Sequence, residues 1–188
     1  YEVELKLARV LNNHLDREVG RTHRVTVLTL EGVRYLVDTG FGGNGPITPI
    51  ALVVNTEQTA GLDRYRILVT DKGEYDLQVL KDDDFFTLYR FDSAVYTNAD
   101  CELGHFYSHK HPNAVFLKHL MVTLKKEHQM VTLVNEKLTT RDRQGERVCV
   151  IESPESRGRI LGVEFNIELD SMLVTSLFER FVLEKLPQ

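Results

Sequence analysis

The sequence predicts an α+β protein that is mainly β, in which short antiparallel strands dominate and a helix ends the chain. Three observations support this prediction. Apolar and polar residues alternate over many short segments, as they do in half-buried strands. Turn signals that contain glycine separate these segments at close spacing, which favours a small barrel or sandwich. Near the C-terminus apolar residues recur instead at every third or fourth position, as on one face of a helix.

Most of the expected strands lie in residues 1–91. Apolar residues occupy every second position from Tyr1 to Leu7, which is typical of a half-buried strand. Glu31-Gly32 separates two further alternating runs and predicts a hairpin. The strands expected in this part of the chain cover residues 1–11, 23–30, 33–38, 64–70, 74–80 and 85–91.

The last of these strands is rich in aromatic residues. Alternation divides it into two faces, with Phe85, Thr87, Tyr89 and Phe91 on one side and Phe86, Leu88 and Arg90 on the other. Tyr89 is therefore expected to share a face with Phe85.

The second half of the chain begins with residues 92–118, which show no regular period and are expected to be rich in loops. Four more strands are expected at residues 120–124, 130–134, 137–141 and 147–151. A helix capped by Asp170 or Ser171 follows, with an apolar stripe of Leu173, Val174, Leu177, Phe178 and Phe181. Pro187 is expected to end this helix.

Composition excludes several classes of protein. The formal net charge of −5 argues against a broad nucleic-acid-binding surface. The two cysteines, Cys101 and Cys149, form no CxxC pair, so we expect no disulfide framework and a reducing, cytoplasmic compartment. Cys149 stands between two valines and is expected to be a small core residue. No apolar run approaches the roughly 20 residues that a membrane-spanning helix needs.

The first residues suggest that the sequence continues upstream of Tyr1. The chain does not begin with Met, and it opens inside an expected strand. Domains rarely start within a strand, so we expect a preceding segment.

A histidine begins the first strand of the first expected hairpin, and an aspartate ends its second strand. His23 enters the hairpin, Asp38 leaves it, and a glycine-rich loop with Gly40, Gly42 and Gly43 follows at once. The hairpin brings its two ends together, and a histidine held by a carboxylate can activate a nucleophile. The alternative interpretation is a strand histidine and a solvated aspartate at a turn. The loop matches neither a Walker loop nor a dinucleotide-binding fingerprint.

A second cluster contains Cys101, His105, His109 and His111. These residue types bind zinc, but their spacings match no standard zinc-finger pattern. A polar surface loop without metal is the preferred interpretation, and no metal is expected.

Three segments together resemble the arylamine N-acetyltransferases. The first is Thr22-His23-Arg24, the second is YLVDTGFGG from Tyr35 to Gly43, and the third is FYSHKHPNAVF from Phe106 to Phe116. The resemblance covers essentially the whole chain, as the latter two-thirds of the family's sequence.

This resemblance implies a three-part architecture, of which two parts are present. Residues 1–95 would form an antiparallel β-barrel that carries the histidine and aspartate of a catalytic triad. Residues 96–188 would form a smaller α/β lid domain with the C-terminal helix. The family's N-terminal helical bundle, whose Arg-Gly-Gly-x-Cys motif holds the nucleophilic cysteine, is missing here, and neither Cys101 nor Cys149 lies in such a motif.

The resemblance also implies roles for individual residues. His23 and Asp38 would be the triad histidine and aspartate, and Phe41 would line the pocket for an aromatic amine or hydrazine. Acetyl-CoA would be the co-substrate, with Thr22, Gly40, Gly42, Gly43 and Ser108 as candidate contacts. The implied reaction is ping-pong acetyl transfer to the nitrogen of arylamines, arylhydrazines or N-hydroxyarylamines, a chemistry of xenobiotic metabolism. Its partners are small molecules and the missing Cys-bearing segment, with no nucleic acid and no membrane.

Two alternatives remain open. The chain could be a β-rich module that binds CoA or aromatic compounds without chemistry of its own. It could instead be a regulatory domain that binds metal through His105, His109 and His111.

Overall fold

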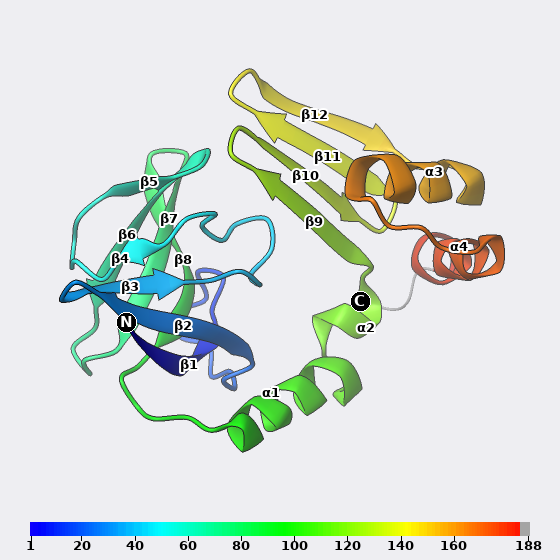
Figure 1. Ribbon diagram of the computed structural model, residues 1–188. Helices are drawn as coiled ribbons and strands as arrows, with labels where there is room; N and C mark the ends of the chain where they lie inside the picture. Colours follow the sequence, from blue (N-terminus) through cyan, green and yellow to red (C-terminus); the bar gives the residue numbers. More distant parts are fainter. Residues whose placement is uncertain (185–188) are drawn as a thin grey trace. The chain divides into compact units, whose positions relative to one another are not determined.

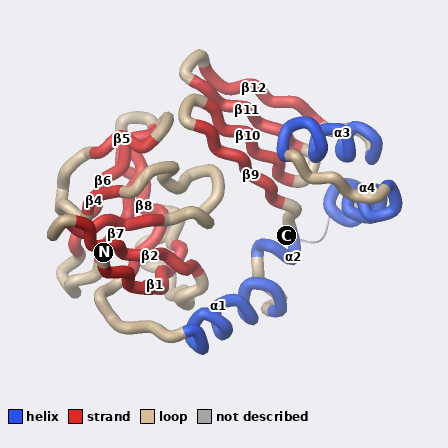
Figure 2. Tube along the Cα trace, viewed as in Figure 1, coloured by secondary structure: helices blue, strands red, loops and turns tan. Residues whose placement is uncertain are grey.

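The structure, a computed structural model, describes residues 1–184. It forms two compact units, Tyr1–Ser108 and His109–Gln188, which we describe separately (Figure 1). Strands make up most of the regular structure of the first unit, and the helices are few (Figure 2). The mainly β class expected from the sequence is confirmed, whereas the division at residue 95 into barrel and lid stays a prediction.

The first unit is an eight-stranded antiparallel sheet that curls into a nearly closed barrel (Figure 1). Its strand order is β4-β3-β2-β1-β8-β7-β6-β5. The bounds are β1 (Glu2–Val10), β2 (His23–Leu30), β3 (Val33–Val37), β4 (Ile50–Ala51), β5 (Gln58–Ala60), β6 (Asp63–Val69), β7 (Tyr75–Lys81) and β8 (Asp84–Phe91). All the longer strands were predicted, whereas β4 and β5 are too short to show a period.

One side chain bridges the seam between β4 and β5, the two edge strands of this sheet. The Gln58 amide on β5 accepts a hydrogen bond from the Ala51 N–H and donates one to the Ala51 carbonyl on β4, both at 2.8 Å. It thereby imitates the paired backbone bonds of an antiparallel ladder. The seam therefore leaves fewer edge groups unpaired than an open sheet does.

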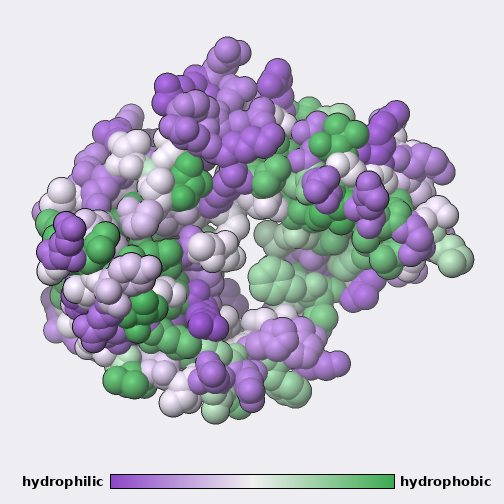
Figure 3. Space-filling model, in the orientation of Figure 1, coloured by the Kyte–Doolittle hydropathy of each residue, from purple (hydrophilic) through white to green (hydrophobic). Residues whose placement is uncertain are grey.

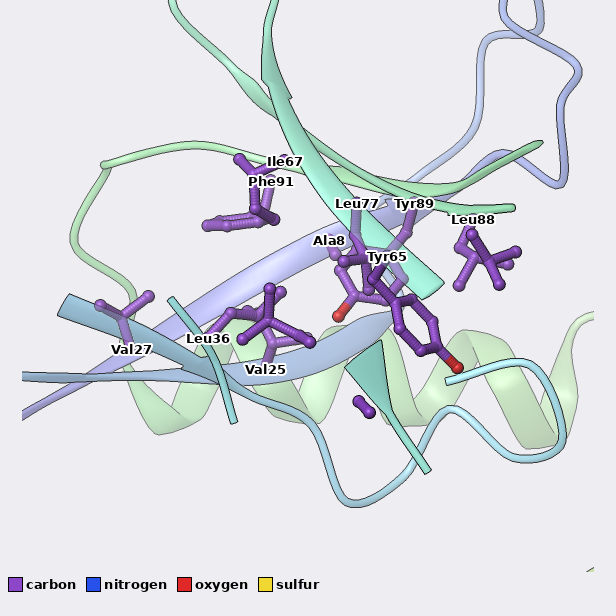
Figure 4. Packing of buried hydrophobic residues seen from close by; sticks show 13 residues of the cluster. Ala8, Val25, Val27, Leu36, Tyr65, Ile67, Leu77, Leu88, Tyr89 and Phe91 are labelled. Carbon is purple, nitrogen blue, oxygen red and sulfur yellow. The ribbon is translucent and has the colours of Figure 1, made fainter. Parts of the chain in front are cut away.

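The barrel core consists of side chains from every strand of the sheet (Figure 4). Val25 and Val27 on β2 and Leu36 on β3 are fully buried, as alternation along a strand requires. Tyr65 on β6 and Tyr89 on β8 lie in the same cluster and bring two hydroxyl groups into an otherwise apolar interior.

Residues 92–118 contain two helices, α1 (Asn98–Lys110) and α2 (Val115–Lys118), so the expectation of a loop-rich stretch is wrong. Helix α1 begins with a side-chain cap, in which Asp100 accepts hydrogen bonds from the N–H and hydroxyl of Thr97. Gly104 is its one buried residue. A Cβ at Gly104 would lie 3.1 Å from the Arg21 carbonyl oxygen, so glycine permits the close approach of α1 to the barrel.

The second unit pairs a four-stranded antiparallel sheet with two helices (Figure 1). The sheet order is β12-β11-β10-β9, with β9 (Met121–Lys126), β10 (Gln129–Val134), β11 (Lys137–Asp142) and β12 (Gly145–Val150). The helices α3 (Pro154–Phe165) and α4 (Ser171–Phe178) pack on it through Leu161, Phe165 and Phe178. Charged residues occupy the hairpin tips and form the purple cluster at the top of Figure 3, so this end of the sheet is solvated.

The helical part of the second unit differs from the expectation in one element. Helix α4 begins where predicted, with the Asp170 carboxylate accepting from the Leu173 N–H, and continues as a π-helical turn, η1 (Glu179–Leu183). Helix α3 was not predicted, although Ser153 caps it and Pro154 occupies its first turn. The expected helix end at Pro187 lies outside the described residues. Within residues 1–184 no helix is long and apolar enough to cross a membrane.

Candidate active site

The structure brings His23 and Asp38 together. His23 is the first residue of β2, and Asp38 directly follows β3, so the hairpin places both at the same end of the barrel. The His23 Nε2 lies 2.8 Å from the Asp38 Oδ2. The aspartate side chain is fully buried, and the histidine side chain keeps 14% of its exposure. This leaves the imidazole, but not the carboxylate, accessible to a reactant.

The second carboxylate oxygen of Asp38 orders the loop that follows. Its Oδ1 accepts hydrogen bonds from the backbone N–H groups of Gly40 at 3.0 Å and Phe41 at 3.1 Å. Burial alone would raise the pKa of Asp38, but the hydrogen bond and charge of His23, the Gly40 N–H and Tyr89 together lower the pKa below its usual value. Asp38 is therefore ionised at neutral pH and can hold one tautomer of His23.

Two aromatic rings enclose the imidazole. The Phe41 ring meets His23 edge-on with centroids 5.2 Å apart, and the Tyr89 ring lies 5.1 Å from each of them. Burial, followed by the Asp38 carboxylate, raises the pKa of Tyr89 well above its usual value, so its hydroxyl stays protonated. Among residues 1–184, this buried hydroxyl has no partner at hydrogen-bonding distance and angle, although it lies near enough to Asp38 to lower the pKa of that carboxyl.

Tyr89 is the member of this site that the sequence did not reveal. A β-bulge shifts the pairing of β7 with β8, so that Val79 faces Phe86 while Leu77 faces Tyr89. The extra residue turns Tyr89 to the same side as Phe86, and the expectation that it shares a face with Phe85 is wrong. Arg66 stacks on Phe85 instead, with its guanidinium 3.7 Å from the ring centroid.

The other candidate residues lie directly before His23, in the loop after Asp38, and on helix α1. Thr22 precedes His23, and its N–H bonds to the Ala8 carbonyl at 3.1 Å. Gly42 and Gly43 belong to a turn that the Gly45 N–H closes on the Gly42 carbonyl. Ser108 lies on α1, and its hydroxyl donates to the Gly104 carbonyl of the same helix at 2.9 Å.

Both cysteines are free thiols. Cys101 lies on α1, and Cys149 is exposed on the edge strand β12, which corrects the expectation that it belongs to the core. No three His, Cys, Asp or Glu side chains among residues 1–184 are grouped so that they could hold a metal ion. The hypothesis of a regulatory metal site at His105, His109 and His111 thus gains no geometric support.

The chain matches known proteins over most of its length. A family model described as N-acetyltransferase matches residues 1–174. Curated and solved proteins that match the chain are arylamine N-acetyltransferases. The chain belongs to the arylamine N-acetyltransferase family.

Among curated members of this family, the enzyme of Escherichia coli (strain K12) is 31% identical over 122 residues, covering 65% of this chain and 43% of the relative. A relative from Salmonella typhimurium, described as arylamine N-acetyltransferase / N-hydroxyarylamine O-acetyltransferase, is 28% identical over 156 residues, covering 82% and 55%. The chain thus spans about half the length of these relatives.

Solved arylamine N-acetyltransferases share the fold. The Salmonella typhimurium structure matches with a TM-score of 0.89 at 22% identity, covering 96% of this chain and 69% of its own. The Mycobacterium marinum enzyme, solved in complex with CoA, matches with a TM-score of 0.86 at 25% identity, covering 94% and 68%. At 22% identity, the match to the Salmonella typhimurium structure shows a shared fold alone.

Proposed function

We propose that this chain is the part of an arylamine N-acetyltransferase that carries the histidine and aspartate of a Cys-His-Asp triad. The protein would transfer the acetyl group of acetyl-CoA to the nitrogen of arylamines, arylhydrazines or N-hydroxyarylamines. The nucleophilic cysteine would come from a helical segment outside these 188 residues. The 2.8 Å contact between His23 and a buried, ionised Asp38 is the observation that carries this proposal.

The contact between Nε2 and Asp38 supports a different role for each imidazole nitrogen. Nε2 faces Asp38 and donates its proton to the carboxylate, so Nδ1 is left to accept a proton from a thiol. The thiolate then attacks the carbonyl carbon of acetyl-CoA, the C–S bond to CoA breaks, and the CoA sulfur takes the proton from imidazolium. In the second half-reaction the amine nitrogen attacks the carbonyl carbon of the acetyl-cysteine and the C–S bond breaks. His23 takes the proton from the amine and passes it to the cysteine sulfur, which leaves as the thiol. Asp38 stabilises the imidazolium in both steps.

The residues around this pair fit the two substrates of the proposal. Phe41 offers an apolar ring beside the imidazole, where an aromatic acceptor would bind. The backbone of Gly42 and Gly43 allows CoA phosphates to approach without Cβ clashes. Thr22, Gly40 and Ser108 complete the proposed CoA contacts, although the Gly40 N–H and the Ser108 hydroxyl already have partners within the fold. We place the reaction in the cytoplasm, as part of xenobiotic metabolism.

The test uses a polypeptide that contains both this chain and the proposed cysteine segment. With acetyl-CoA and an aromatic hydrazine, we expect CoA release that His23→Ala abolishes and that the exposed-site control His128→Ala leaves unchanged. Wild-type rates in a folded His23→Ala variant would refute the triad. If the unaltered protein binds CoA but releases none from acetyl-CoA, the result would instead favour the non-catalytic binding module.

The role of Phe41 is tested by separating the two half-reactions. Phe41→Ala should slow acetyl transfer to the acceptor more than acetylation of the enzyme, because the ring is proposed to line the acceptor pocket. Equal effects on both half-reactions would mean that Phe41 only packs the core.

A further inference from the structure

Hydrogen bonds hold the loop between β3 and β4 both at its start and further along the chain. At its start, the Asp38 carboxylate holds the N–H groups of Gly40 and Phe41. Further along, the chain turns from Gly42 to Gly45, and the Tyr65 hydroxyl donates a hydrogen bond of 3.0 Å to the carbonyl oxygen of Asn44 in this turn. Phe41 lies between Asp38 and Asn44, the residues whose oxygen atoms accept these bonds.

The hydroxyl of Tyr65 reaches this loop from another strand of the barrel, β6. Tyr65 lies on β6, where it pairs with Val79, and its side chain is fully buried. In Figure 4 its ring lies among the core side chains, and the hydroxyl points out of the cluster toward the loop. Phenylalanine would fill the same apolar space, so packing alone does not account for the hydroxyl group. A buried hydroxyl needs a hydrogen-bond partner, and the Asn44 carbonyl supplies it.

The Phe41 ring is in turn held against the site. It contacts His23 and Tyr89 at centroid distances of 5.2 and 5.1 Å and packs on the barrel core. Glycines at positions 40, 42, 43 and 45 give the loop many backbone conformations, and Gly42 has a φ of 84°. Without the bond from Tyr65, the part of the loop that follows Phe41 loses a restraint and would hold the ring in one place only part of the time.

We propose that Tyr65 is a positioning residue that determines how well the site binds its aromatic acceptor, by fixing the loop that presents Phe41. This inference rests on the proposed function, in which Phe41 lines the acceptor pocket. Tyr65 itself touches no reacting atom. The hairpin register and Asp38 hold His23 in place, and neither depends on the Asn44 carbonyl. Loss of the Tyr65 hydroxyl should therefore affect the acceptor step and leave the acetylation step intact.

The experiment compares Tyr65→Phe with Tyr75→Phe. Tyr75 is a matched control because it packs against the same core, stacks on Phe91 at 5.3 Å, and its hydroxyl makes no hydrogen bond within residues 1–184. In ping-pong kinetics, kcat/KM for acetyl-CoA reports the first half-reaction and kcat/KM for the hydrazine reports the second. For Tyr65→Phe we expect the second value to fall about fivefold, with the first within about twofold of wild type. Tyr75→Phe should change neither value.

Hydrogen exchange gives a readout that needs no activity. In the 188-residue chain, amide exchange over residues 41–45 should be at least about fivefold faster in Tyr65→Phe than in wild type, and unchanged in Tyr75→Phe. Unchanged exchange in this loop would overturn the inference whether or not the protein transfers acetyl groups. Equal loss of both half-reactions, or loss of neither, would overturn it in an active enzyme. Absence of transfer by the unaltered protein would refute the proposed function instead, and exchange would then decide the role of Tyr65 in the loop.

Discussion

Replacing Asp38 by asparagine removes one charge and keeps the shape of the side chain. The amide oxygen can still accept from the Gly40 and Phe41 N–H groups, whereas the amide nitrogen would face His23 and favour the wrong tautomer. A negative charge about 4 Å from an imidazolium contributes about 4 kcal/mol at the effective dielectric constant near 20 that suits protein sites. At 1.36 kcal/mol per factor of ten, its loss should slow the acetylation step about 10³-fold.

The assay is single-turnover CoA release from acetyl-CoA by a polypeptide that carries the proposed cysteine. Asp76→Asn provides the control, because Asp76 is also a buried carboxylate of the barrel but pairs with Arg90 at 2.7 Å instead of a histidine. It should destabilise the fold without a comparable loss of rate per folded molecule. An Asp38→Asn variant that is folded and reacts within about tenfold of wild type would refute the electrostatic role given to Asp38.

Three further predictions concern stability, measured by urea unfolding. Gly104→Val should destabilise the chain by about 1–3 kcal/mol, since a Cβ there already meets the Arg21 carbonyl at 3.1 Å. Gly162→Ala, with open space around it, should instead stabilise the chain by about 0.5–1 kcal/mol. Equal effects of the two substitutions would contradict the close contact at Gly104. Gln58→Leu should cost about 2 kcal/mol by leaving the Ala51 N–H and carbonyl unpaired, and no loss would mean that the seam does not need this bridge. Because the pKa of Asp38 is lowered in the folded state, its contribution is present above the unfolded-state value of about 3.9 and disappears as the pH falls through the folded value. Asp38→Asn should therefore flatten the loss of stability below about pH 4, and an unchanged profile would exclude Asp38 as a cause.

The hairpin that carries the site could be predicted because its signals are local. Glu31 and Gly32 adopt φ values of 52° and 79°, as a tight two-residue hairpin turn requires, and Leu30 pairs with Val33 on either side. Once the turn is fixed, the register follows, and the two ends of the hairpin must meet.

Features that depend on tertiary contacts were not predictable from the sequence. The bulge that redirects Tyr89 arises in the pairing of β7 with β8 and breaks the alternation on which the prediction relied. Helix α1 was missed because its one buried residue, Gly104, leaves no apolar stripe to detect. The Thr97 and Asp100 pair that caps this helix was the signal in the sequence from which its start could have been predicted.

The two oxygens of Asp38 have a consequence for how sequences of this fold are interpreted. One oxygen faces His23 and the other holds the backbone of the following loop. A descendant that had lost all transfer chemistry would still need the aspartate to keep that loop in shape, so selection for folding alone would preserve it. Retention of the aspartate is therefore weak evidence of activity in a distant homologue. The histidine, which supplies none of these backbone bonds, is the residue whose loss would mark an inactive lineage.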